Sequence, residues 1–327
     1  MVRADYFHLS KDNCRSKLTA SIRIKCILRS MPIYLKKNMI RNLCFFLHVS
    51  GFIFVLLVNF GYSQVNYYGH RGCRGLLPEN SIPAFQKALE LGADGIELDV
   101  VVNKDRQLVV SHEPYFKKDF CSDSSGNEIT DEQKYNTFLM SQNDIRKFDC
   151  GSHGNPGYLE QKGLPVSKPL LQEVFEQVNL KGKTLLLEVK SEEKEYGISQ
   201  PKPKEFAKLV YSEAKKLPSD VKLYYMSFDP KILEELYALD STIQTVYLTY
   251  SPFKSYRKFL REIHITPTVL GMYYPTISKK KVLQLKNKGI STFAWTVNES
   301  QLSNQLINKG VVGIITDYPD RVQGQND

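Results

Sequence analysis

The sequence lacks a charge excess over most of its length. Residues 1–63 contain ten Lys or Arg and two Asp or Glu, whereas residues 64–327 contain 34 and 33, so almost all of the formal net charge of +9 belongs to the first segment. A nearly neutral body exerts no long-range attraction on polyanions. Nucleic acid is therefore not expected as a partner.

Cysteine motifs for metal binding or redox chemistry are also missing. No two of the six cysteines stand at CxxC spacing, which argues against a zinc site or a thioredoxin-like motif. Cys121 and Cys150 fall in one irregular stretch, and they can form a disulfide in an oxidising compartment. The alternative is that these residues and Cys73 are buried free thiols.

Long apolar runs are absent except for residues 43–60 (LCFFLHVSGFIFVLLVNF). Basic side chains precede this run, and Gly61 and Ser63 place small residues before a cleavage site, as in a secretory signal peptide. We therefore expect cleavage after Ser63 and a secreted or periplasmic product. The run is also long enough to span a bilayer, so an uncleaved anchor formed by residues 43–60 is the alternative, and it alone would make the membrane a partner.

Residues 1–38 do not fit a usual signal peptide, because such a signal begins near the N-terminus. Met39 stands at the right place to begin one. We expect residues 39–63 to be the signal peptide and residues 1–38 to be an over-extended reading of the gene. The alternative is a polar, disordered cytoplasmic tail.

Residues 64–327 alternate short β-rich runs with helical patterns, which is typical of βα units around a parallel sheet. No GxGxxG motif follows the first strand, which disfavours a dinucleotide-binding fold. About 250 residues of such units fit an α/β fold of the (β/α)8 TIM barrel type better than an open sheet. Nine runs compete for eight places, and the sequence does not identify the extra one. The expected strands are 67–70, 95–102, 108–112, 184–190, 223–228, 245–248, 269–273, 292–297 and 313–316, and the expected helices are 81–91, 169–178, 204–217, 230–239, 278–288 and 299–309.

Residues 114–168 break this alternation. They are rich in Gly, Asn, Ser, Pro and Lys, with one short helical stretch near 142–148. We expect an insertion in the loop after the third strand. In a barrel, the loops that follow strands form the face that carries the active site.

Glu97 and Asp99 stand two residues apart in an expected strand, so their carboxylates share a face. Two buried carboxylates side by side repel each other and lose solvation, and therefore need a cation or a proton. A hard divalent ion is the natural partner. An ion pair with Arg or Lys across the barrel is the alternative.

Glu188 and Lys190 repeat this spacing on a later strand. Glu188 can supply a third oxygen ligand, and Lys190 can hold an anionic substrate. An internal Glu188–Lys190 ion pair fits the spacing equally well.

His70 and His112 each stand at the C-terminal end of an expected strand, where barrels carry catalytic groups. Two imidazoles can act as base and acid on opposite sides of one phosphorus atom. Arg71 offers a planar fork for phosphate oxygens. A purely structural role is the alternative for each histidine, and it is the role expected for His153 and His264.

Nine short blocks follow one another in order over about residues 66–320. They are GHRG at 69–72, PENS at 78–81, AF at 84–85, GAD at 92–94, ELDV at 97–100, VVSH at 109–112, EVK at 188–190, WTVN at 295–298 and GIITD at 313–317. Taken together and in this order, the blocks resemble the signature of the glycerophosphodiester phosphodiesterase family. The likeness covers nearly the whole chain after the apolar run, and the number of blocks makes it specific.

The resemblance implies a (β/α)8 barrel, a divalent metal (Ca²⁺ or Mg²⁺), and hydrolysis of glycerophosphodiesters to an alcohol and glycerol 3-phosphate. Carried over block by block, it makes His70 and His112 the acid–base pair. It makes Glu97, Asp99 and Glu188 the metal ligands.

The same resemblance implies the substrate contacts. Arg71 and Lys190 would hold phosphate, and Trp295 would wall the pocket and touch the glycerol. Glu79 would support the site from the loop after the first strand, through the metal or through Arg71.

The sequence departs from the family pattern at a few places. Ser81 stands where Thr is frequent, Glu113 where Asp is common, and Arg106 where Gly is frequent, and none of these changes removes a chemical group that the reaction needs. The usual Arg-Thr-Thr segment after His112 is replaced by the insertion, residues 114–168, which leaves the substrate preference open.

The implied mechanism has one histidine remove a proton from a glycerol hydroxyl or from water while the other protonates the departing alcohol. The sequence decides neither which histidine does which nor whether a cyclic phosphate forms. One rival is a phospholipase of the phosphoinositide or sphingomyelinase D kind acting on intact lipid, which needs an exposed apolar rim. The insertion offers only aromatic residues interleaved with Lys for this purpose. The other rival is a catalytically dead phosphodiester-binding protein, against which the intact histidines and carboxylates argue.

Overall fold

The computed structural model describes residues 65–251 and 254–322, together with Pro32 and Tyr34. The expected signal peptide, the alternative anchor at 43–60 and most of residues 1–38 lie outside the described residues. Within the described residues, no helix has both the length and the apolar character needed to cross a bilayer.

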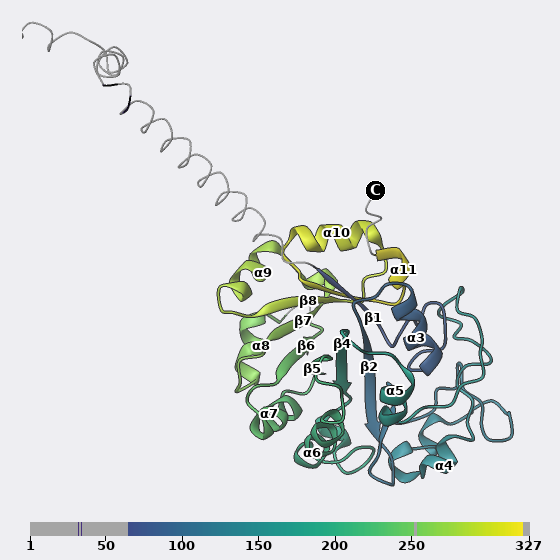
Figure 1. Cartoon of the computed structure of the whole chain (residues 1–327). Coiled ribbons are helices and arrows are strands. Elements are labelled where there is room, and N and C mark those ends of the chain that lie inside the picture. Colours follow the sequence, from purple (N-terminus) through teal and green to yellow (C-terminus); the bar gives the residue numbers. More distant parts are fainter. Residues whose placement is uncertain (1–31, 33, 35–64, 252–253, 323–327) are drawn as a thin grey trace, which may run out of the picture. The chain divides into compact units, whose positions relative to one another are not determined.

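Eight parallel strands of the described chain form a closed barrel (Figure 1). The ring closes because β1 pairs with both β2 and β9. This confirms the expected (β/α)8 barrel. The strands are β1 (Asn66–Gly69), β2 (Gly95–Val102), β4 (Thr184–Val189), β5 (Lys222–Ser227), β6 (Gln244–Thr249), β7 (Val269–Tyr273), β8 (Ser291–Trp295) and β9 (Gly313–Thr316).

The ninth strand candidate is β3 (Leu108–Val110), which pairs antiparallel with the end of β2. Val100 lies opposite Val110 and Val102 opposite Leu108, so β2 and β3 form a hairpin at the rim of the barrel. The insertion therefore follows the third strand of the chain, as expected, but leaves from this hairpin and not from a barrel strand.

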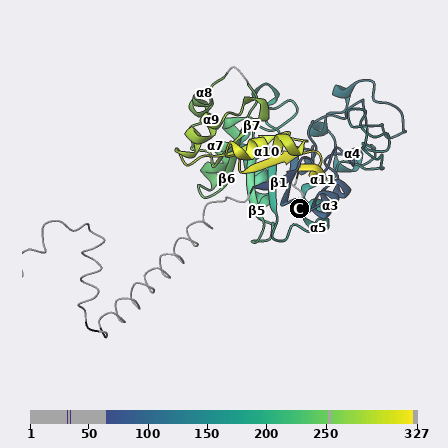
Figure 2. The ribbon, with the colours of Figure 1, turned by 90° about the horizontal axis from the view of Figure 1, so that it is seen from above.

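Helices surround the barrel and cover the outer faces of the strands (Figure 2). The first of them shows why these segments are helical: the Ser81 side chain caps its N-terminus, a proline occupies its first turn, and Ala84, Phe85 and Ala88 form its buried face. The helices are α3 (Ile82–Glu90), α5 (Leu171–Gln177), α6 (Pro203–Ala214), α7 (Pro230–Leu239), α8 (Tyr256–Glu262), α9 (Lys279–Lys286), α10 (Ser300–Asn308) and α11 (Pro319–Val322).

The alternation along β2 divides its side chains between two environments. Ile96, Leu98 and Val100 belong to the core between strands and helices. Glu97 and Asp99 are also buried but point the other way, into the barrel. The floor of the barrel is apolar, and its buried residues are Tyr68, Leu186, Tyr224, Met226, Val246, Leu248, Val269, Phe293 and Ile315.

The insertion is a compact extension with the short helix α4 (Gln142–Ile145). Its own apolar cluster includes Phe116 and Phe148, whose rings stack 4.0 Å apart. A disulfide joins Cys121 to Cys150 with an S–S distance of 2.07 Å, so the structure has the pairing and not the free thiols that the sequence left as the alternative. Cys73 is a buried free thiol.

Candidate active site

His70 follows β1, at the C-terminal end of the barrel. The turn is tight, because a Cβ on Gly69 would lie 2.2 Å from the carbonyl oxygen of Gly72, so only glycine fits there. The His70 backbone N–H donates to the carbonyl of Thr316 at 2.7 Å, which ties the first strand's end to the last strand. Its side chain is 13% exposed.

Asp317, directly after β9, orients the His70 ring. Its Oδ1 lies 2.7 Å from His70 Nδ1 and 2.6 Å from Arg74 Nε, while Oδ2 accepts from Asn298 Nδ2 at 2.9 Å. Burial, assisted by the charge of Arg74 and opposed by Asp317, lowers the pKa of His70 to about 4. The imidazole is therefore neutral near pH 7, with Nδ1–H donating to Asp317 and Nε2 free to accept a proton.

Glu97, Asp99 and Glu188 form a buried carboxylate cluster. Asp99 and Glu188 are direct partners in the register of β2 and β4. One oxygen from each of the three carboxylates lies within 4.8 Å of the others. Glu97 Oε1 and Asp99 Oδ1 have no hydrogen-bond partner among the described residues. Buried hard oxygen donors left unsatisfied in this way fit a divalent cation such as Ca²⁺ or Mg²⁺.

The electrostatics of this cluster follow from its crowding. Burial, and then the neighbouring Asp99 and Glu188, raise the pKa of Glu97 well above its usual value. Burial alone would also raise the pKa of Asp99, but His112, Arg71 and Lys190 together hold it below its usual value.

Arg71 links the loop that follows β1, which carries His70, to the carboxylate cluster. Its Nη1 donates to Glu79 at 2.8 Å, its Nε lies 3.3 Å from Asp99 Oδ2, and its backbone N–H donates to Glu97 at 2.8 Å. Asn80 adds a second link, because its amide donates to Asp99 Oδ2 at 2.9 Å. Arg71 and Asn80 both have positive φ, 49° and 54°, so strained backbone is held at the site by these contacts.

His112 follows β3 on the other side of the carboxylates. Its Nδ1 lies 2.8 Å from Glu113 Oε1 and its Nε2 lies 3.0 Å from Lys190 Nζ. Lys190 also donates to Glu188 at 2.7 Å and lies 3.7 Å from Asp99. The Glu188–Lys190 ion pair that the spacing allowed is thus present, alongside a carboxylate cluster that fits a metal.

Two cavities meet at His112, Glu188 and Phe228. The first, of about 190 Å³, is lined by both histidines, Arg71, Glu97 and Glu188 and lies above the apolar barrel floor. The second, of about 360 Å³, is lined mostly by polar and charged residues. Trp295 lines the first, and its Nε1 has no hydrogen-bond partner within the described part of the chain.

The nine predicted site residues all lie at the C-terminal end of the barrel. His153, which bonds Ser122, and His264, which pairs with Glu234, lie outside both cavities, as expected for structural residues.

Several contributors were not predicted as site residues. Asp317 stood in the last block of the resemblance, directly after a strand, and that position was a usable signal. Asn80 and Asn298 also stood in blocks of the resemblance, PENS at 78–81 and WTVN at 295–298, but nothing there assigned them a role. Arg74 lies outside the blocks, and nothing in the local sequence ties it to Asp317.

A closed βα barrel that carries two histidines beside a buried carboxylate cluster, with Arg and Lys side chains close by, is the arrangement expected of a phosphodiester hydrolase. The sequence model of the Glycerophosphoryl diester phosphodiesterase family matches residues 70–321, and the chain belongs to this family. It is therefore an enzyme that hydrolyses glycerophosphodiesters.

Individual relatives are consistent with this family assignment. The chain is 28% identical over 263 residues to a Glycerophosphodiester phosphodiesterase of Bacillus subtilis, covering 77% of this chain and 83% of that one. It is 26% identical over 294 residues to Lysophospholipase D GDPD1 of Mus musculus, covering 79% and 84%. Its fold is similar to that of an Oleispira antarctica phosphodiesterase solved with the product sn-glycerol-3-phosphate, with a TM-score of 0.65, 23% identity, and coverage of 79% and 95%.

Proposed function

We propose that the enzyme cleaves glycerophosphodiesters to glycerol 3-phosphate and an alcohol by two-histidine acid–base catalysis, with a divalent metal on the carboxylate cluster. The observation that carries this proposal is that His70 and His112 line one cavity together with Glu97 and Glu188, two members of the buried carboxylate cluster that Asp99 completes.

The two histidines differ in a way that suggests their roles. His70 is held neutral by burial and is aimed by Asp317, so it suits the base that takes a proton from the attacking hydroxyl. His112 is more exposed, its ring is oriented by the Glu113 carboxylate 2.8 Å from Nδ1, and it lies where the second cavity opens for the departing alcohol. We therefore assign the acid that protonates the departing alcohol to His112.

The substrate is placed by the remaining groups. Arg71 lines the cavity that holds both histidines, Lys190 lines the adjoining cavity beside His112, and both would hold the phosphate oxygens. The glycerol would lie against Trp295, whose free Nε1–H can donate to a hydroxyl. The alcohol would leave past His112 into the polar cavity.

Glu97, Asp99 and Glu188 would hold the metal. When bound, a divalent ion would neutralise charge on the phosphate and lower the pKa of a coordinated hydroxyl. Attack by a glycerol hydroxyl, followed by opening of a cyclic phosphate, and direct attack by water give the same products.

The test offers the purified enzyme glycerophosphocholine, glycerophosphoethanolamine and glycerophosphoinositol, with and without chelator. Release of glycerol 3-phosphate that stops with chelator and returns with Ca²⁺ or Mg²⁺ supports the proposal. Turnover that ignores chelation contradicts the metal, and no turnover of any of the three contradicts the substrate class.

An acylated substrate is the second candidate, and an aromatic rim favours it. Rings from the ends of four successive barrel strands gather around Trp295: Phe228 at 5.5 Å, Tyr273 at 5.5 Å and Tyr250 at 6.0 Å. Phe228 is 40% and Tyr250 60% exposed. This is an apolar rim of the kind that an acyl chain requires, and one relative is named a lysophospholipase D. Comparing lysophosphatidylcholine with glycerophosphocholine distinguishes the two substrates.

We also propose that the enzyme is exported, with cleavage after Ser63. The Cys121–Cys150 disulfide supports this, because such bonds persist in oxidising compartments. N-terminal sequencing should find Gln64 first, and a membrane-retained full-length chain would favour the anchor.

A further inference from the structure

Lys168 is a buried lysine that the proposed chemistry does not use. It is the last residue of the insertion and is 9% exposed. Its Nζ donates to Ser111 Oγ at 2.8 Å, to the carbonyl of Tyr115 at 2.5 Å and, more weakly, to the carbonyl of Glu113 at 3.4 Å. Three acceptors for three N–H groups leave this ammonium fully satisfied.

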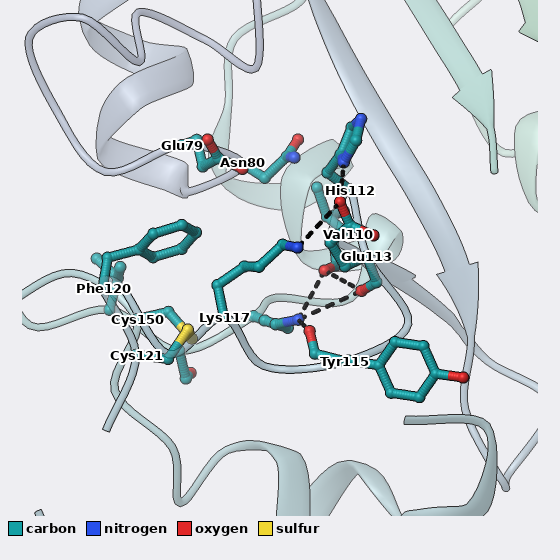
Figure 3. A pocket seen from close by; sticks show the side chains of 14 residues that line it. Glu79, Asn80, Val110, His112, Glu113, Tyr115, Lys117, Phe120, Cys121 and Cys150 are labelled. Atoms are coloured by element: carbon teal, nitrogen blue, oxygen red, sulfur yellow. Dashed lines mark hydrogen bonds and ion pairs between the residues drawn. A yellow bond between two sulfur atoms is a disulfide. The ribbon is translucent and has the colours of Figure 1, made fainter. Parts of the chain in front are cut away.

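The acceptors all belong to the segment 111–115, which carries His112. The segment is tied further, because Ser111 Oγ donates to the Glu113 carbonyl at 2.7 Å. Figure 3 shows the result, with Glu113 turned to His112 and Lys117 reaching Glu113 from the insertion. Lys168 thus binds the chain on both sides of His112, in addition to the bond from the Ser111 N–H to Asp99 and the bonds from Thr137 to the Pro114 carbonyl.

The backbone of Lys168 is itself fixed. Its carbonyl accepts from Gln142 Nε2 at 3.2 Å, and the next residue's carbonyl accepts from the Val110 N–H at 2.8 Å. Its Nζ lies 4.4 Å from the centre of the Phe116 ring. Burial lowers the pKa of Lys168 to about 7, so the amine is kept in this place at an electrostatic cost.

We propose that Lys168 is a positioning residue for His112: it fixes the segment 111–115 so that the His112 ring is held in the cavity, with Nε2 beside Lys190, where the phosphodiester would bind. This inference rests on the proposed function, in which His112 is the acid. It also makes the insertion part of the catalytic apparatus, since the fixing group comes from its end.

The first test compares Lys168→Met with Lys183→Met in the purified enzyme. Methionine keeps an apolar stem but donates no hydrogen bonds. Lys183 is the matched control, because its Nζ donates to the Ala93 carbonyl at 2.9 Å, far from the site at the other end of β4. Misplacing a catalytic group by about 1 Å can cost roughly 10²-fold. We expect kcat for glycerophosphocholine to fall roughly 10–10²-fold in Lys168→Met, while KM changes less than about threefold. In Lys183→Met, kcat should stay at the wild-type value.

The second test asks whether the loss passes through His112. In a His112→Ala background, Lys168→Met should lower kcat by less than about twofold, because the group that it positions is gone. A multiplicative loss in the double variant would overturn the inference, as would unchanged kcat in Lys168→Met or an equal loss in Lys183→Met. If Lys168→Met does not fold, Ser111→Ala takes its place in both comparisons, with a fall of a few-fold expected because one of three contacts is removed.

These outcomes separate the two levels of the proposal. If His112→Ala alone keeps full activity, the assigned acid is wrong. If His112→Ala collapses kcat and Lys168→Met does not, only the positioning role fails.

Discussion

At the scale of single residues, the site is built from two imidazoles with unlike surroundings. His70 is enclosed and bonded to Asp317, which is itself held by Arg74 and Asn298. His112 is half-buried and bonded to its own chain neighbour, Glu113. This asymmetry underlies the proposed assignment of His70 as base and His112 as acid, and it leads to two predictions.

The first prediction concerns the leaving group. The p-nitrophenolate group of a p-nitrophenyl ester of glycerophosphate departs without protonation, whereas the choline alkoxide needs a proton in order to leave. His112→Ala should therefore lose roughly 10²–10⁴-fold in kcat on glycerophosphocholine but far less on the p-nitrophenyl ester, while His70→Ala should lose a similar factor on both. Steady-state assays with both substrates decide the matter, and a reversed pattern would exchange the assigned roles.

The second prediction concerns pH. A base acts when deprotonated, so kcat/KM should fall on the acid side near the pKa of His70, about 4, and not near its usual 6.5. The positive charge of Arg74 helps to lower that pKa, so Arg74→Gln should move the acid limb to higher pH. The profile is measured from pH 3.5 to 8, with enzyme returned to pH 7 after each exposure to check for inactivation. An acid limb that Arg74→Gln does not move would contradict His70 as the titrating base and assign the limb to protons on Glu97 and Glu188.

At the scale of elements, the sequence predicts most of the barrel because the local hydrophobic pattern identifies most strands and helices. The spacing of Glu97 and Asp99 was enough to place both on one face of a strand, because residues two apart in a strand point the same way. It was not enough to show that 108–110 runs antiparallel, because alternation is the same for either direction. Helix α8 was missed because its seven residues carry only two buried side chains. Lys168 could not be identified either, since its partners lie more than 50 residues away.

The third prediction concerns the insertion. Its disulfide joins residues 29 apart and belongs to the insertion, so it should hold this element more than the barrel. Replacing Cys121 and Cys150 together by Ala should cost roughly 2–4 kcal/mol of free energy of unfolding. Hydrogen exchange should rise within 116–150, and the reduced wild type should match the variant. Unchanged exchange in this range would mean that the apolar cluster alone holds the insertion.

At the scale of the whole molecule, the carboxylate cluster links metal binding to stability. The fourth prediction is that Ca²⁺ or Mg²⁺ raises Tm, because a ligand at about 100 times its Kd stabilises by roughly 2.7 kcal/mol. Asp99→Asn and Glu188→Gln should blunt the rise. Glu234→Gln, which alters a carboxylate paired with the exposed His264, should not. Calorimetry with and without chelator measures the shift, and equal Tm values would make the cluster a set of ion pairs with Arg71 and Lys190.

The carboxylate cluster also makes the metal-induced rise in Tm depend on pH. The folded-state pKa values of Glu97 and Glu188 are raised, so their contribution to the metal-free fold is present at low pH and is lost as the pH rises through those values. Protons also compete with the ion for the same oxygens. The metal-induced rise in Tm should therefore be larger at pH 8 than at pH 5.5.

The barrel closes between its first and last strands, and the His70–Asp317 pair lies across this seam, 247 residues apart along the chain. A nascent polypeptide that has not yet emerged as far as β9 has His70, the proposed base, but not the carboxylate that aims it, and β1 has no β9 to pair with. We therefore expect the enzyme to gain activity only after this segment has emerged. A product cut before Gly313 should be not a weaker enzyme but an inactive, open-edged chain.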